Sequence, residues 1–92
     1  MVRTMQADLR AAIGAMLSSD WKRAHQIVQR HEDDPLACWM HAVLHKIEGD
    51  ANNSRYWYEQ SAHSYDEFTD TQQELAAVKR AVEDRAKAGE SG

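Results

Sequence analysis

Cysteine, proline and glycine are scarce in this chain of 92 residues, which has one cysteine, one proline and four glycines. A single cysteine excludes a disulfide framework within the chain and is typical of a reducing compartment. So few prolines and glycines leave little to interrupt helices, and no stretch keeps the strict polar–apolar alternation of strands. The sequence therefore predicts an all-α fold.

Long hydrophobic runs and clusters of basic residues are also lacking. No apolar segment approaches the roughly 18 residues of a membrane-spanning helix, and the first residues lack the continuous apolar stretch of a signal peptide. Lysine and arginine are interspersed with acids, and the formal net charge is −4, which argues against nucleic acid as a partner. We therefore expect a cytoplasmic protein that binds neither nucleic acid nor a membrane.

The apolar periodicity predicts five helices within a single helical domain at residues 1–88, followed by a disordered tail at 89–92. The helices are expected at about residues 4–17, 20–30, 35–48, 51–63 and 64–85. Asp34 before Pro35 is typical of a helix start, and Gly49 is typical of a helix end. Ser64 and Glu67 fit a capping box that opens the fifth helix. The buried face of this helix is expected to comprise Phe68, Leu75, Val78 and Val82.

An internal repeat relates the first two expected helix pairs, because Asp20 and Asp50 lie at their corners 30 residues apart. Small residues recur at matching positions around the corners: Ala12 and Ala42 before them, Ala24 and Ser54 after them. The pattern resembles the tetratricopeptide repeat, although that family repeats at about 34 residues and Ser19 stands where its corner glycine is expected. The resemblance covers residues 5–62 and implies two antiparallel helix pairs with a C-terminal capping helix.

A second resemblance is to a small group of uncharacterised bacterial proteins. It is carried by three runs: Trp21-x-x-Ala24-His25-x-Ile27, then Trp39-x-His41-Ala42-x-Leu44-His45 with Glu48-Gly49-Asp50, then Tyr56-Trp57-Tyr58. This resemblance implies a shared fold and no particular activity.

One face of the helix expected at 35–48 gathers groups that bind metals. His41, His45 and Glu48 fall within an arc of about 60° on the side away from the apolar stripe, and His25 is expected to approach them. Two imidazoles four residues apart on a helix can share one divalent ion. Metalloproteases have a glutamate where this chain has Ala42, so peptidase activity is not expected. The alternatives are histidines that only pack and hydrogen-bond, or a pH-sensitive interface.

The three consecutive aromatic residues at 56–58 are the second candidate feature. Neighbours on a helix are about 100° apart, so three in a row cannot all face one core. Tyr58 is expected in the core, and either Tyr56 or Trp57 is expected to be exposed or at an interface. Together with Trp39, Tyr56 and Trp57 are the candidates for a protein-contact surface.

Cys38 is expected to be a small buried hydrophobe, because no oxyanion donor accompanies it. We therefore expect no enzymatic activity and no obligatory cofactor. The favoured function is a protein-interaction or scaffold module that binds a protein partner or forms a homodimer. The alternative is a protein that binds a divalent metal or small ligand through His25, His41, His45 and Glu48.

Overall fold

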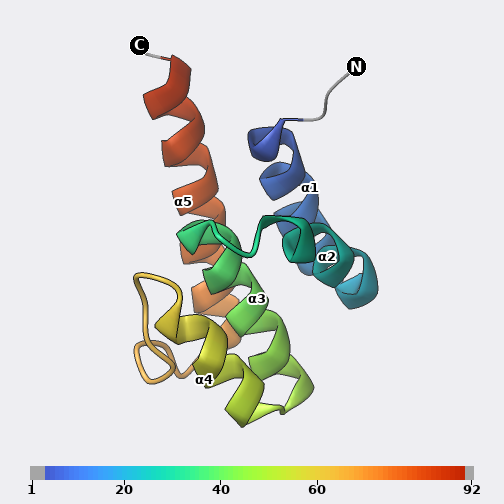
Figure 1. Cartoon of the computed structure of the whole chain (residues 1–92), viewed down its shortest axis with the longest axis vertical. Helices are drawn as coiled ribbons and strands as arrows, with labels where there is room; N and C mark the ends of the chain where they lie inside the picture. Colours follow the sequence, from blue (N-terminus) through green and yellow to red (C-terminus); the bar gives the residue numbers. More distant parts are fainter. Residues whose placement is uncertain (1–3, 91–92) are drawn as a thin grey trace.

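The computed structural model describes residues 4–90, which form five α-helices and one short 3-10 helix. The α-helices are α1 (Met5–Leu17), α2 (Trp21–Val28), α3 (Pro35–Glu48), α4 (Ala51–Glu59) and α5 (Thr71–Glu90), and the 3-10 helix Gln29–His31 follows α2 (Figure 1). No strand occurs within residues 4–90, which confirms the all-α prediction. None of the described helices is long and apolar enough to cross a membrane.

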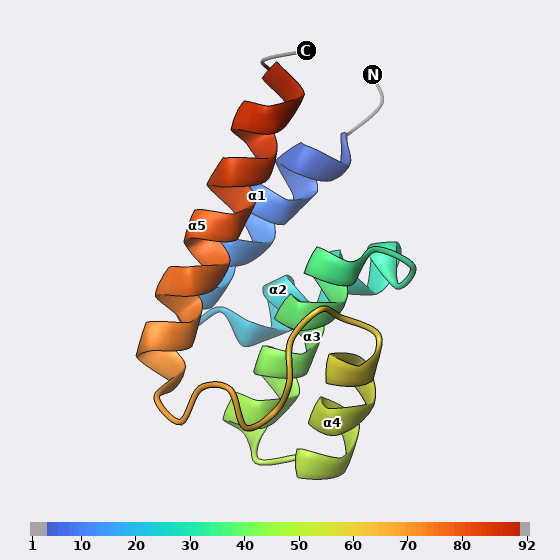
Figure 2. The same cartoon turned by 90° about the vertical axis from the view of Figure 1, so that its left-hand side faces the viewer.

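The helices pack as two antiparallel pairs, and the fifth helix contacts one helix of each pair. α1 packs on α2, α3 packs on α4, and α5 contacts α1 and α3. Figure 1 and Figure 2 both show α5 running alongside α1 in the opposite direction. The core lies between the pairs and α5. The predicted layout of two helix pairs and a C-terminal helix is confirmed.

The two corners of these pairs have the same backbone geometry. Ser19 and Gly49 both adopt left-handed φ angles, 62° and 88°. The next residue at each corner, Asp20 or Asp50, donates its backbone N–H to the carbonyl oxygen five residues earlier, at 2.8 and 2.9 Å. Its side chain then caps the following helix. The 30-residue echo in the sequence therefore corresponds to a repeated corner, with Ser19 in a conformation that glycine adopts without strain.

Small residues at the repeated positions allow the paired helices to approach closely. All four of them, Ala12, Ala24, Ala42 and Ser54, are fully buried. The Ser54 hydroxyl donates to the carbonyl oxygen of Ala42 at 2.7 Å, which links α4 directly to α3. Larger side chains fill the remaining core, among them Leu9, Met16, Met40, Val43, Leu75 and Val78.

The junction between α4 and α5 differs from the prediction. Residues 60–70 form an irregular connection where two helices were expected to meet. The predicted capping box of Ser64 and Glu67 forms an isolated turn, in which the Ser64 N–H donates to the Glu67 carboxylate at 3.4 Å. Asp70 caps α5 instead, and Phe68 lies in the connection rather than on a helix.

The far end of α5 also differs from the prediction, because the helix continues to Glu90 instead of fraying after Arg85. At the expected end, Arg85 donates two hydrogen bonds to the carboxylate of Asp34, at 2.9 and 2.7 Å, and so ties α5 to the start of α3. Burial raises the pKa of Asp34, but Arg85 and backbone N–H groups lower it overall. Of the predicted tail at 89–92, residues 91 and 92 lie outside the described residues.

A fully buried carboxylate lies where α3, α4 and α5 meet. Glu74 of α5 accepts hydrogen bonds from the indole N–H of Trp39 at 2.9 Å and from the hydroxyl of Tyr58 at 2.5 Å. Its charge is balanced by the Lys46 ammonium at 3.0 Å. Burial, followed by the hydrogen bond to Glu74, holds the pKa of Tyr58 well above its usual range, so the hydroxyl remains a donor.

Lys46 also holds the irregular connection in place. Its ammonium donates to the carbonyl oxygens of Tyr65 at 2.9 Å and Phe68 at 2.8 Å. One largely buried cation therefore satisfies two backbone acceptors of residues 60–70 as well as the carboxylate of Glu74.

Candidate functional site

Three histidines from two helices meet where α2 contacts α3. His25 of α2 and His41 and His45 of α3 each offer one ring nitrogen, and these three atoms lie within 4.8 Å of one another. The Nε2 atoms of His25 and His41 are 3.0 Å apart. The predicted face of α3 is thus present, and His25 approaches it as expected. These three residues are called the histidine triad below.

His41 is the buried member of the histidine triad, with 3% of its surface exposed. Its ring stacks on Trp57 of α4, with centroids 4.0 Å apart and 14° between the planes. Burial, and then the charges of His25 and His45, lowers the pKa of His41 to about 3. The ring is therefore neutral near pH 7, which is the form that ligates metals.

One nitrogen of this buried ring is unpartnered. The Nδ1 of His41 has no hydrogen-bond partner among the residues that the structure describes. Leaving a buried polar atom in this state costs about 1–3 kcal/mol. Native structures rarely retain such an atom without a bound water, an ion or a functional reason. Nδ1 is not the nitrogen that faces His25, so an ion held between the Nε2 atoms of His25 and His41 would leave Nδ1 without a partner.

Glu48 orients the third histidine of the triad. The Nδ1 of His45 lies 2.8 Å from a carboxylate oxygen of Glu48, so the imidazole N–H donates to that carboxylate. In the neutral ring, Nε2 then carries the lone pair. Carboxylates placed in this way fix the orientation of metal-ligating histidines and raise their basicity. The structure thus places Glu48 behind His45 rather than among the three converging nitrogens.

The spacing of the histidine triad fits a tetrahedral transition-metal ion. With metal–nitrogen bonds of 2.0–2.1 Å, two ligating nitrogens lie about 3.3 Å apart. The separation of 3.0 Å between the Nε2 atoms of His25 and His41 is close to this value. The nitrogens span no more than 4.8 Å, so reaching the same spacing requires an adjustment of at most about 1.5 Å. His25 and His45 are only half-buried, which leaves their rings room to adjust.

A cavity of about 300 Å³ adjoins the histidine triad and offers a route to it. It is lined by Trp21, Lys22, His25, Leu44 and Glu48. Two of these residues, His25 and Glu48, also belong to the arrangement around the triad. An ion or water molecule can therefore approach the triad from solvent through this cavity.

The three aromatic candidates for a contact surface do not form one patch. Trp39 lies in the core, because α5 and residues 60–70 cover that side of α3. Its predicted place on a contact surface is therefore wrong. Trp57 is half-buried against His41. Tyr56 is exposed to 53%, and Tyr58 is buried. The expected division into one core ring and one exposed ring is confirmed.

Cys38, His31 and His63 lie outside the histidine triad, and each contacts its own partner in the fold. Cys38 is buried and its thiol donates to the carbonyl oxygen of Glu32 at 3.1 Å. Burial, followed by nearby acids, raises the pKa of this thiol, which suppresses the reactive thiolate. His31 lies 2.7 Å from a carboxylate oxygen of Asp8, and His63 stacks on a core tryptophan. Neither histidine joins the triad.

No protein-family model, curated protein or solved structure matches this chain. The geometry of the histidine triad is therefore the basis for assigning its chemistry.

Proposed function

We propose that this protein binds a divalent transition-metal ion at the histidine triad. The convergence of three ring nitrogens within 4.8 Å carries this proposal. Imidazole is a ligand of zinc, copper and nickel, and zinc is the reference ion for a tetrahedral arrangement. His41 contributes a neutral ring that is already fixed by stacking on Trp57.

The coordination that we propose has an open position. Three protein ligands leave the fourth position of a tetrahedral ion to water or to an exchangeable ligand. The cavity beside His25 and Glu48 supports access to such a position. The role proposed is reversible metal binding in the cytoplasm, and Glu48 acts as the group that orients His45.

Titration with cobalt tests this function directly. The full chain, stripped with a chelator, is titrated with Co²⁺ while the visible absorption of a tetrahedral ion is recorded, and Zn²⁺ is then added as a competitor. We expect one ion per chain. Replacing His25 or His45 with glutamine should weaken binding at least about tenfold, the minimum typical of losing even an orienting group.

His63 provides the matched control, because it is a partly exposed histidine outside the triad. His63→Gln should bind Co²⁺ as the unmodified chain does. Equal affinities for the unmodified chain and His25→Gln, or no tetrahedral spectrum at all, would show that the histidines only pack and would remove the proposed function.

Protein interaction is a second function, favoured by the exposed Leu17 and the cationic side chains of Arg10, Lys79 and Lys87, which lie together along α1 and α5. The proposed kinship with tetratricopeptide repeats is supported by the matching geometry at Ser19 and Gly49. Neither point depends on metal binding.

A further inference from the structure

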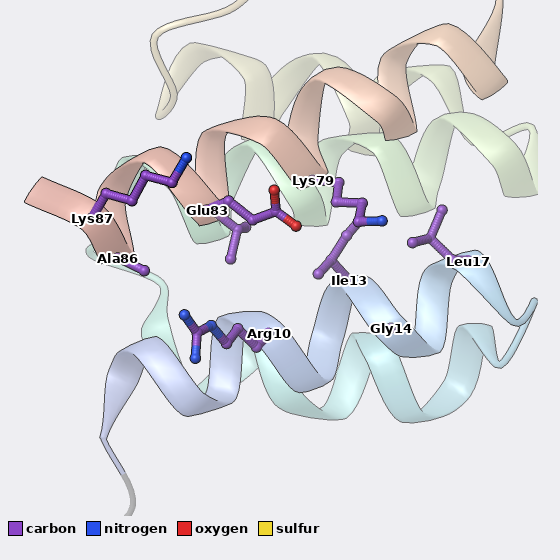
Figure 3. A pocket seen from close by; sticks show the side chains of 9 residues that line it. Arg10, Ile13, Gly14, Leu17, Lys79, Glu83, Ala86 and Lys87 are labelled. Atoms are coloured by element: carbon purple, nitrogen blue, oxygen red, sulfur yellow. The ribbon is translucent and has the colours of Figure 1, made fainter.

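A groove of about 470 Å³ runs between α1 and α5 (Figure 3). Its apolar part is formed by Ile13 of α1 and by Val82 and Ala86 of α5. Leu17 stands at one end of the groove, and 49% of its surface is exposed. Ile13, Val82 and Ala86 form the floor of the groove and are only 5%, 1% and 6% exposed, so the apolar strip that the groove presents consists of this floor and the exposed Leu17.

Cations surround this apolar strip. Arg10 of α1 and Lys79 and Lys87 of α5 line the groove together with one acid, Glu83. In Figure 3, the Arg10 and Lys79 side chains extend into the space between the two helices. The groove thus has a local excess of positive charge in a chain whose formal net charge is −4. Such a local reversal of sign favours partners of opposite charge.

We propose that this groove binds an acidic amphipathic helix of another protein. The apolar stripe of such a helix would pack on the exposed Leu17 and on the floor of the groove, and its flanking acids would pair with the cations on the rim. A helix lying between α1 and α5 would complete a three-helix layer. This inference is independent of the histidine triad, which lies on other helices.

The charge of the groove also argues against two other occupants. A second copy of the chain, placed groove to groove about a twofold axis, would bring two cation-rich rims together and repel. A nucleic acid would use the cations but leave the apolar strip uncovered, and three cations make a small patch for phosphates.

Gly14 keeps the groove open and provides a selective way to close it. A Cβ added at this position meets nothing within 4 Å, and Gly14 lines the groove, so a larger side chain here would extend toward the groove. Glycine within a helix is also destabilising relative to residues with a side chain. A side chain at this position is therefore compatible with helix α1.

Fluorescence polarisation with a designed peptide tests the proposal. The probe is a labelled helical peptide of about five turns with a leucine–isoleucine stripe flanked by glutamates. A counterpart carries lysines at the glutamate positions. We expect the full chain to bind the acidic peptide at least about tenfold more tightly than the basic one, and to bind it more weakly as salt is raised.

Variants of the protein locate the binding. Lys79→Glu and Lys87→Glu should each weaken binding of the acidic peptide about tenfold, and Gly14→Trp should weaken it by filling the groove, with its Tm measured to verify that the variant is folded. Lys22→Glu is the matched control, because Lys22 lies outside the groove, and it should bind normally.

Three results would overturn the proposal: equal binding of the two peptides, normal binding by the groove variants, or binding of a small anionic amphiphile such as dodecanoate without binding of the acidic helix.

Discussion

The Nε2 atoms of His25 and His41 face each other at 3.0 Å across the contact between α2 and α3. A neutral imidazole carries one N–H, so one of these rings donates to the other and a single proton lies between two nitrogens. A metal ion that binds both nitrogens takes the place of that proton. Either a hydrogen bond or a metal ion can therefore link these two nitrogens, and the proton and the metal compete for them.

Acid should destabilise the metal-free protein because of His41. The pKa of this ring is 6.5 when unfolded and about 3 in the fold, so between these values the unfolded chain binds the additional proton. The free energy of unfolding should fall by about 1.4 kcal/mol for each pH unit below 6.5. Above pH 6.5, His41 should cause no further change in this free energy. Urea denaturation at several pH values, with chelator present, measures this slope.

His41→Phe is the matching variant, because phenylalanine retains a ring for stacking on Trp57 and does not titrate. It should show a shallower dependence of stability on pH in this range. An unchanged slope would mean that other groups cause the acid sensitivity.

Glu48 should matter for metal affinity although it does not join the triad. Glu48→Gln removes the carboxylate that accepts from the Nδ1–H of His45, and affinity for Co²⁺ or Zn²⁺ should fall about 10–100-fold. Glu67→Gln is the control, since Glu67 makes a similar exposed contact with His63 outside the triad. Isothermal titration calorimetry gives both affinities. Equal values for the two variants would contradict the orienting role.

Both corners should favour glycine, so removing it at position 49 and introducing it at position 19 should change stability in opposite directions. Gly49→Ala should destabilise the fold by about 1 kcal/mol, because its φ of 88° strains any residue with a Cβ and no contact offsets the strain. Ser19→Gly should stabilise it by up to about 1 kcal/mol by relieving the same strain.

Gly14→Ala should also stabilise the fold, because Gly14 is helical and has open space around it. Urea midpoints of the three variants give the signs, and a neutral Gly49→Ala would contradict the left-handed corner.

Removing Lys46 should be among the most damaging single changes. Lys46→Met leaves the fully buried Glu74 without its counter-charge, which should cost about 3–5 kcal/mol of stability. Adding Glu74→Gln to this variant should restore part of the loss, since the amide carries no charge. Urea denaturation of the single and double variants forms the cycle, and additive losses would show that the pair is not coupled.

Local patterns predicted the helices, the corners and the histidine triad. Residues 41 and 45 share a face because they are four positions apart on one helix. Residue 25 approaches them because of the way the neighbouring helix pair folds. The two corners were visible because each needs an aspartate cap and a left-handed residue before it. Such signals are local, and tertiary contacts reinforce them here.

The position of Trp39 and the start of α5 could not be predicted in this way. Both depend on Glu74 and Lys46, which lie 28 residues apart and carry no local mark of being buried together. Ser64 and Glu67 form the turn that their spacing predicts. The backbone does not continue into a helix there, because Lys46 binds the nearby carbonyl oxygens of residues 65 and 68. A long-range polar network thus overrides a correct local signal.

The Lys46 ammonium has a kinetic consequence for the exposed connection at 60–70. Opening this segment takes two carbonyl oxygens, of Tyr65 and Phe68, away from an ammonium that stays paired with Glu74. Local opening therefore removes two charge-assisted hydrogen bonds at once. Amide exchange in the connection, and its cleavage by a protease, should then be slower than in a surface loop without such an anchor.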